Sequence, residues 1–206
     1  MPSIVIHTSS SPTHLFLLFH GVGATPQSLE PLGKLIALDH PNAAVVSVEA
    51  PEVSDLGQGF QWFSIKGVTE KNRLSRIEKA LPSFVECVQS WQAEFQASYQ
   101  NTCLIGFSQG AIMSLSSSQL SSSSLASRII SLSGRFATLP QIAPKETQII
   151  FFHGENDEII NIEFAKNAYH ALVALGADTE LHTIPQLGHA ITQAEADKLL
   201  SLLKQN

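Results

Sequence analysis

The segment Gly106-Phe107-Ser108-Gln109-Gly110 places a glycine two positions to either side of a serine. The residues before it predict a strand and those after it predict a helix, so the serine stands on a sharp turn. The glycines remove side chains that would collide with neighbouring backbone, and the hydroxyl is left exposed at the positive end of the helix. This pattern is typical of a nucleophilic serine, although a turn serine that only caps the helix is the alternative.

A serine hydroxyl is a weak nucleophile at neutral pH, so it requires a base, and the base requires an acid that fixes its tautomer. After a predicted strand, the turn from His153 to Glu158 contains three carboxylates. Asp157 is the preferred acid because a short side chain is easier to hold rigidly against an imidazole, with Glu155 and Glu158 as alternatives.

The base is expected on the loop after the following predicted strand. His189 lies there, just before the last predicted helix, and we expect its neighbour Gly188 to let the backbone turn the imidazole inward. His153 is a rival base, but we interpret it as a residue that shapes the acid turn. The serine, the acid and His189 all follow strands, and functional groups of an open parallel sheet collect beyond the carboxyl ends of its strands.

Attack of the serine on a carbonyl creates an oxyanion, which requires preset donors, usually two backbone N–H groups. The first is expected at Gln109, directly after the serine. The second is expected in His20-Gly21-Val22-Gly23, where the glycines permit an unusual turn after an apolar strand. We assign it to Val22, with a neighbouring amide or a plain glycine turn as the alternatives.

Short apolar runs alternate with longer amphipathic stretches along the chain, which predicts a parallel sheet with crossover helices. Strands are expected near residues 4–7, 15–19, 44–48, 102–106, 129–132, 148–152 and 179–184. Helices are expected at about 27–38, 73–97, 110–125, 162–175 and 193–203. The expected fold is one α/β domain over residues 1–206, with a mostly parallel central sheet and helices on both faces.

Two segments interrupt this alternation. Residues 49–68 are rich in glycine and aromatic side chains and too long for an ordinary turn, so we expect a loop over the site. Its Trp62 is a candidate substrate-binding residue, or else a plug beneath the loop. The serine-rich stretch 114–127 resembles a linker, but apolar residues recur within it and we predict a helix.

Composition excludes several classes of protein. The 206 residues are 44% hydrophobic with a net charge of −6 and no basic run, which argues against disorder and against nucleic-acid binding. No apolar run is long enough to cross a bilayer and no secretory signal is visible, so we expect a cytoplasmic protein. Cys87 and Cys103 fit neither a redox pair nor a zinc site, and the histidines form no metal motif, so we expect two reduced thiols, no metal and no cofactor.

The motifs LFHGVGA, GFSQGA, HGENDE and GHAI occur in this order along nearly the whole chain. With them the sequence resembles the phospholipase/carboxylesterase family, small single-domain α/β-hydrolases that include acyl-protein thioesterases and bacterial carboxylesterases. The resemblance implies Ser108 as nucleophile, Asp157 as acid and His189 as base, with the amides of Val22 and Gln109 as oxyanion donors. It agrees with the assignment from the residues themselves.

The resemblance implies a serine carboxylesterase that hydrolyses short to medium acyl esters through an acyl-enzyme. A thioesterase or lysophospholipase with the same triad, and a binding module without turnover, are the alternatives. Two departures stand out: Ser64 replaces the aspartate of the family's WFD element, and Glu158 replaces a proline after the acid. We expect the first to change the polar contacts of the loop, and the second to make the turn more flexible and disfavour anionic substrates. The sequence does not indicate the oligomeric state.

Overall fold

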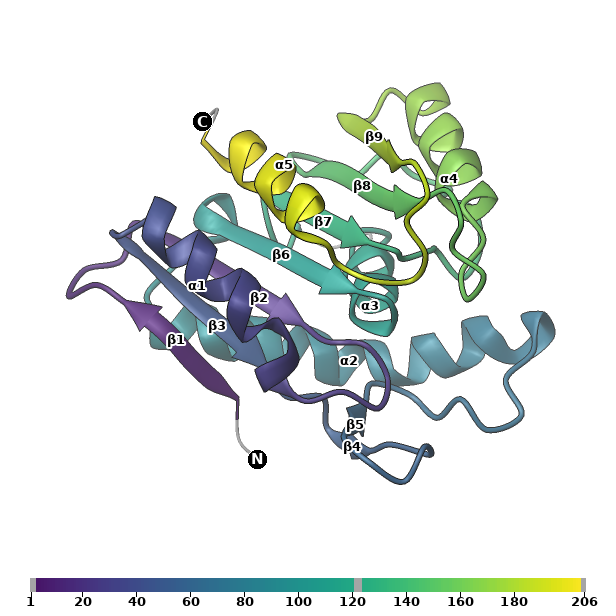
Figure 1. Cartoon of the computed structure of the whole chain (residues 1–206), viewed down its shortest axis with the longest axis horizontal. Coiled ribbons are helices and arrows are strands. Elements are labelled where there is room, and N and C mark those ends of the chain that lie inside the picture. The colour runs from purple at the N-terminus through teal and green to yellow at the C-terminus, as the bar shows by residue number, and fades with distance from the viewer. Residues whose placement is uncertain (1–2, 121–123, 205–206) are drawn as a thin grey trace.

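The computed structural model describes residues 3–120 and 124–204. A seven-stranded sheet with the order β1-β3-β2-β6-β7-β8-β9 forms its centre (Figure 1). All neighbouring strands are parallel except β1, which runs antiparallel to β3. The strands are β1 (Ile4–Thr8), β2 (His14–Phe19), β3 (Ala43–Val48), β6 (Thr102–Phe107), β7 (Arg128–Leu132), β8 (Gln148–Gly154) and β9 (Thr179–Ile184). Each predicted strand is confirmed within two residues of its expected bounds.

Helices cover both faces of the sheet, as Figure 1 shows. One face carries α1 (Glu30–Asp39) and α5 (Gln193–Leu203), and the other carries α2 (Glu70–Glu94), α3 (Gln109–Ser117) and α4 (Glu163–Ala174). Two short 3-10 helices, at Pro26–Leu29 and Tyr99–Asn101, precede α1 and β6. Among the described residues, no helix combines the length and the apolar character that crossing a membrane would need.

Burial on both faces explains the apolar sequence of the central strands. Along β2, Leu15, Leu17 and Phe19 pack toward α2 and α3. The alternate residues, Phe16 and Leu18, pack toward α1 and α5. Because successive side chains of a strand point to opposite faces, a strand covered twice has no polar side.

The serine-rich helix is shorter than predicted. The structure ends α3 at Ser117, whereas the prediction extended to residue 125; residues 121–123 lie outside the described part of the chain. Within α3, Ser114 and Ser116 donate their hydroxyls to carbonyls one turn earlier, and Ser117 and Ser118 donate to carbonyls three residues back. Such side-chain bonds compete with helix propagation and explain the early end.

Two further details of the helices are set by local chemistry. α2 begins at a capping box of Thr69 and Asn72 and continues through Pro82 without a break. Gly176 has a positive φ of 77° just after α4, as expected for a helix stop.

The two cysteines are free thiols. Cys103 is buried in β6 and Cys87 is half-buried in α2. Burial raises the pKa of Cys87 to about 11 and that of Cys103 to about 12, so both are protonated at neutral pH.

Helix α5 buries a carboxyl group without a partner. Glu195 is 1% exposed, and neither side-chain oxygen has a hydrogen-bond partner among the described residues. Burial raises the pKa of Glu195 to about 7. The folded state therefore holds this proton more tightly than the unfolded chain does. Its contribution to stability is complete below about pH 4.5 and is lost as pH rises through about 7.

The variant Glu195→Gln tests this linkage because it removes the ionisation and keeps the shape. We expect its free energy of unfolding to exceed that of the parent by about 3 kcal/mol at about pH 8, and to match it near about pH 4.5. Urea unfolding at both pH values measures the difference, with the exposed Glu86→Gln as control. A variant no more stable than the parent at the higher pH would show that folding does not raise the pKa of Glu195.

Candidate active site

Ser108 lies on a strained turn between β6 and α3. Its φ of 53° and ψ of −114° are unusual for a residue with a side chain. A Cβ on Gly106 would lie 2.4 Å from the backbone nitrogen of Ala111, and a Cβ on Gly110 would lie 2.1 Å from the carbonyl oxygen of Phe19. Both glycines are therefore required for the close approach of helix and strand that forms the turn, as the sequence predicts.

We expect Gly110→Ala to lower the free energy of unfolding by about 3 kcal/mol, because the added methyl group meets the backbone of a central strand. Gly188→Ala is the matched control: its Cβ would have only the oxygen of Asn156 nearby, at 3.8 Å, and we expect a loss below about 1 kcal/mol. Denaturant unfolding measures both. Equal stability of the Gly110 variant and the parent would contradict the steric explanation.

Three predicted residues meet at the carboxyl edge of the sheet. The Oγ of Ser108 lies 2.9 Å from Nε2 of His189, and Nδ1 of His189 lies 2.8 Å from Oδ2 of Asp157. The carboxylate can only accept, so Nδ1 carries the imidazole proton and donates it to Asp157, while Nε2 is free to accept from the serine hydroxyl. This is the protonation pattern that a general base for the serine requires.

Both carboxylate oxygens of Asp157 have hydrogen-bond partners. Its Oδ1 accepts from the backbone N–H groups of Ile159 and Ile160, each at 2.9 Å, while Oδ2 faces His189. Burial opposes ionisation of this carboxyl group, but the hydrogen bonds and the charge of His189 outweigh it and lower the pKa of Asp157. It is a carboxylate at neutral pH.

The other two carboxylates of the turn point elsewhere. Glu155 accepts a hydrogen bond from the hydroxyl of Thr183, and Glu158 is exposed. Of the three candidates from the sequence, only Asp157 contacts His189 in the described structure.

His153 lies beneath the turn that carries Asp157. It is fully buried, and its Nε2 donates to the carbonyl of Ile160 at 2.7 Å and lies 3.4 Å from Oδ2 of Asp157. Burial lowers the pKa of His153. The imidazole joins both ends of the turn, which fits its interpretation as a shaping residue.

The loop that carries His189 turns in a way that the sequence did not predict. The expectation for Gly188 is wrong: the positive φ of this loop, 60°, belongs to Gln186, and Gly188 is not in the left-handed region. The close approach is made instead at Gly154, where a Cβ would lie 2.3 Å from the carbonyl oxygen of Leu187. A glycine at the end of β8 thus lets the loops of Asp157 and His189 lie against each other.

The predicted oxyanion donors lie beside Ser108. A Cβ on Gly21 would lie 3.2 Å from Cβ of Ser108, so the loop after β2 directly adjoins Ser108. Neither the N–H of Val22 nor that of Gln109 has an acceptor among the described residues. Both are therefore available to a ligand, and Gly23, with φ of 74°, provides the turn between strand and loop.

His20 fixes the geometry of this loop. Its Nδ1 donates to the carbonyl of Gly21 at 2.8 Å, and its Nε2 accepts from the N–H of Ala50 at 3.2 Å. Burial lowers the pKa of His20, and the carbonyl of Gly21 and the charge of Glu49 offset only part of this effect. The imidazole is neutral and links the loop to the chain after β3.

The segment 49–68 packs over the site, as expected, and contains a small hairpin of β4 (Glu52–Val53) and β5 (Phe60–Gln61). The side chain of Gln109, the residue after Ser108, holds this segment: Oε1 accepts from the N–H of Trp62 at 2.8 Å and Nε2 donates to the carbonyl of Phe63 at 2.7 Å. Ser64 donates to Asp55, which also accepts from the N–H of Ile65. Asp55 thus supplies the carboxylate contact for this turn, a role not predicted from the sequence.

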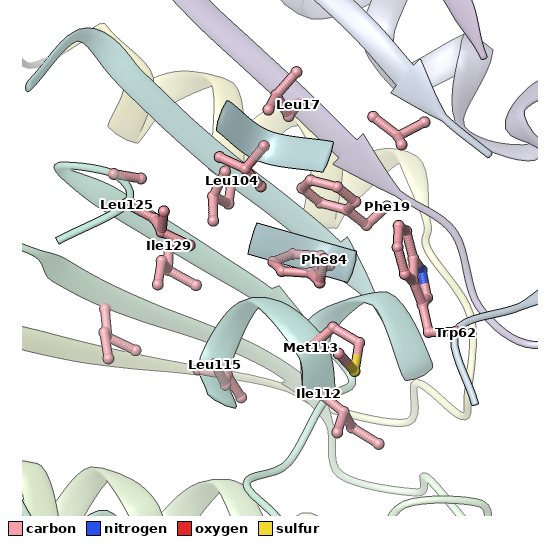
Figure 2. Close-up of a cluster of buried hydrophobic side chains, with 14 of the residues drawn as sticks. Leu17, Phe19, Trp62, Phe84, Leu104, Ile112, Met113, Leu115, Leu125 and Ile129 are labelled. Atoms are coloured by element: carbon pink, nitrogen blue, oxygen red, sulfur yellow. The ribbon is translucent and has the colours of Figure 1, made fainter. Parts of the chain in front are cut away.

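Of the two roles considered for Trp62, its burial favours the plug beneath the loop over substrate binding. The ring is 2% exposed and packs edge-on against Phe19 and Phe84, with centroids at 5.7 and 5.1 Å, in the apolar core (Figure 2). The indole ring fills space beneath the loop because it packs against these two aromatic rings of the core. The neighbouring Phe63 lines the cavity at the serine instead.

A cavity of about 270 Å³ opens at Ser108, and most of its wall is apolar. Its lining comprises Ser108, Gln109 and Val22, the loop residues Phe63, Ile65 and Val68, the helix residue Ile112, Ile159, Ile160 and Phe164, and two arginines, Arg73 and Arg135. A larger hollow of about 580 Å³ is lined by the first residues of β6, β7 and β8, at the opposite edge of the sheet from Ser108. We therefore take the smaller cavity as the candidate substrate site, because Ser108 lies in its wall.

The fold and this site define a serine hydrolase architecture, and comparison with known proteins gives the family. A family model described as phospholipase/carboxylesterase matches residues 2–206, and the chain belongs to this family. It is 43% identical over 188 residues to esterase YpfH of Escherichia coli, a match that covers 91% of this chain and 81% of that protein. It is 24% identical over 226 residues to acyl-protein thioesterase 1 of Neurospora crassa, covering 100% of this chain and 89% of that protein.

Among solved structures, the fold resembles that of esterase PE8. The TM-score is 0.87 at 26% sequence identity, with 99% of this chain and 97% of that chain covered. The α/β fold with a mostly parallel sheet, predicted from the sequence, is confirmed.

Proposed function

We propose that this protein is a serine carboxylesterase that hydrolyses carboxylic esters with short to medium acyl chains. The observation that carries the proposal is the continuous hydrogen-bonded path from Ser108 through His189 to Asp157, placed at a cavity with two unused backbone N–H groups. The family assignment and the identity to an esterase support it. No cofactor is needed for this chemistry.

In the acylation step, Nε2 of His189 takes the hydroxyl proton as Oγ of Ser108 attacks the ester carbonyl. The N–H groups of Val22 and Gln109 stabilise the oxyanion of the tetrahedral intermediate. His189 then donates the proton to the departing alkoxide, which leaves as the alcohol, and the acyl group stays on Ser108. Asp157 stabilises the imidazolium throughout.

Deacylation repeats these roles with water. His189 removes a proton from a water molecule, the hydroxide attacks the acyl carbonyl, and the bond to Ser108 breaks as the serine recovers its proton. The apolar wall of the cavity holds the acyl chain, and its volume lies near the lower end of the range for small-molecule clefts. A short to medium acyl chain follows from that size.

Thioester hydrolysis is the second candidate because the same residues serve a thiolate leaving group, and the chain is similar to acyl-protein thioesterases. The substrate in either case is a small molecule or an acylated carrier. A cytoplasmic location and a single domain over residues 1–206 remain predictions.

Initial rates on p-nitrophenyl esters and acyl-coenzyme A thioesters of matched chain length test the proposal. We expect kcat/KM to be higher for the esters and to fall for long acyl chains. Higher kcat/KM for the thioesters at every chain length would instead favour the thioesterase assignment, and no turnover of either class by folded protein would contradict both.

A further inference from the structure

The cavity at Ser108 contains two arginines that the proposed hydrolysis does not use. Arg135 follows β7 and is 6% exposed, and Arg73 lies in the first turn of α2 with a side chain that is 19% exposed. Both line the cavity, and no carboxylate does. Cationic side chains are rarely buried unless a counter-charge is present, so the charges on this wall need an explanation.

One carboxylate neutralises only part of this charge. Glu70 accepts from Nη1 and Nη2 of Arg135 at 3.0 and 2.7 Å, and from Nε and Nη2 of Arg73 at 3.3 and 3.1 Å. Two guanidinium groups on one carboxylate leave a net charge of about one positive unit. The hydrogen bonds from Arg135 and Arg73 lower the pKa of Glu70, so the carboxylate is ionised at neutral pH.

The guanidinium groups are fixed and keep unused donors. Nε of Arg135 donates to the carbonyl of Phe136, and the ring of Phe164 covers one face of the guanidinium at 3.4 Å. Among the described residues, each terminal nitrogen of Arg135 retains one N–H without an acceptor, and Nη1 of Arg73 has no acceptor. A second anion could therefore bind without displacing Glu70.

The position of the cavity indicates which half of an ester enters it. Its lining includes Ser108 and the two residues with free N–H groups, Val22 and Gln109, but neither His189 nor Asp157. The leaving group takes its proton from His189, so it departs on the side of the imidazole. The cavity then holds the acyl chain, with the arginines on its wall.

We infer that the acyl chain of the preferred substrate carries a terminal carboxylate that binds Arg73 and Arg135, so that the substrate is a half-ester of a dicarboxylic acid. This inference rests on the proposed esterase function and narrows its substrate class. Water cleaves the acyl–oxygen bond of the half-ester and gives the dicarboxylate and the alcohol. This inference runs against the expectation that Glu158 disfavours anionic substrates; Glu158 is exposed and does not line the cavity.

The test compares p-nitrophenyl half-esters of adipate, pimelate and suberate with the same compounds capped as methyl esters, which are neutral. We expect kcat/KM of the parent protein to favour the half-ester by about tenfold at one or more of these lengths. Arg73→Gln should remove most of this preference, measured as the ratio of kcat/KM for the half-ester to kcat/KM for the neutral ester of the same length. Lys71→Gln is the matched control, because it removes an exposed cation two residues away that does not line the cavity.

The neutral esters separate this inference from the proposed function. If folded protein does not hydrolyse them or the half-esters, the esterase proposal itself fails. If it hydrolyses the neutral esters but shows no preference for the half-ester at any length, the inference is overturned. A preference that persists in Arg73→Gln, with only a loss of unfolding free energy, would also overturn the inference. The pair of Arg135 and Glu70 would then serve to join α2 to the loop after β7.

Discussion

Ser108→Ala and His189→Ala should each lower kcat for p-nitrophenyl esters by about 10⁴- to 10⁶-fold, because each removes one end of the proton path between hydroxyl and imidazole. The two losses should not add. Once the nucleophile is absent the base has no proton to accept, so the double variant should be within about twofold of either single variant. Steady-state and single-turnover rates of the three variants measure this.

Additive losses in the double variant would contradict the account, because independent contributions would mean that the two side chains do not act on the same proton. Unfolding by urea serves as the control. Ser108 is 8% exposed, and its replacement by alanine leaves the hydrogen bond between His189 and Asp157 in place. The variants should therefore remain folded, and the free energy of unfolding of Ser108→Ala should lie within about 1 kcal/mol of that of the parent.

Asp157→Asn should lower kcat by about 10³- to 10⁴-fold, although the side chain keeps its shape. Oδ1 accepts from two backbone N–H groups, so the amide oxygen must occupy that position and the amide nitrogen must face His189. A donor there forces Nδ1 to accept and moves the imidazole proton to Nε2. In that tautomer the imidazole cannot accept the proton of Ser108.

Two neighbouring carboxylates provide matched controls for this variant. Glu155→Gln and Glu158→Gln each remove one negative charge from the turn that carries Asp157, and they leave its contact to His189 unchanged. We therefore expect less than about a twofold change in kcat for either variant. A large loss in either control, with activity retained in Asp157→Asn, would show that the acid is not Asp157.

The sheet and the positions of Ser108, Asp157 and His189 could be predicted because local features of the sequence specify them. The covered strands are apolar throughout. Glycine is required on both sides of Ser108 because an added Cβ would lie only 2.1 to 2.4 Å from neighbouring backbone atoms. The chain order of Asp157 and His189 follows from where the parallel strands end. These signals depend on residues close in sequence or on the alternation of elements.

Features that depend on side chains from distant elements could not be predicted in the same way. Trp62 is a core residue because Phe19 and Phe84 are present beneath it, and nothing in the loop indicates this. In the loop of His189, the positive φ lies at Gln186, whereas Gly188 was expected to provide the turn. Local composition gives no account of either.

The arginines of the cavity were missed for a related reason. Arg73 and Arg135 are 62 positions apart and meet only through Glu70. Arg135 stands three residues after the end of β7, at the edge where functional groups collect, and this was a usable signal. The end of α3 at Ser117 also had a local signal, since serine has a low helix propensity.

The most direct test of the central claim is to identify the residue that a fluorophosphonate probe labels. Peptide mapping of the parent protein should place the phosphonyl group on Ser108 alone, since only this serine is activated by an imidazole in the described structure. Labelling should become much slower in His189→Ala. A folded parent protein that stays unlabelled, or that carries the label on another serine, would contradict the account.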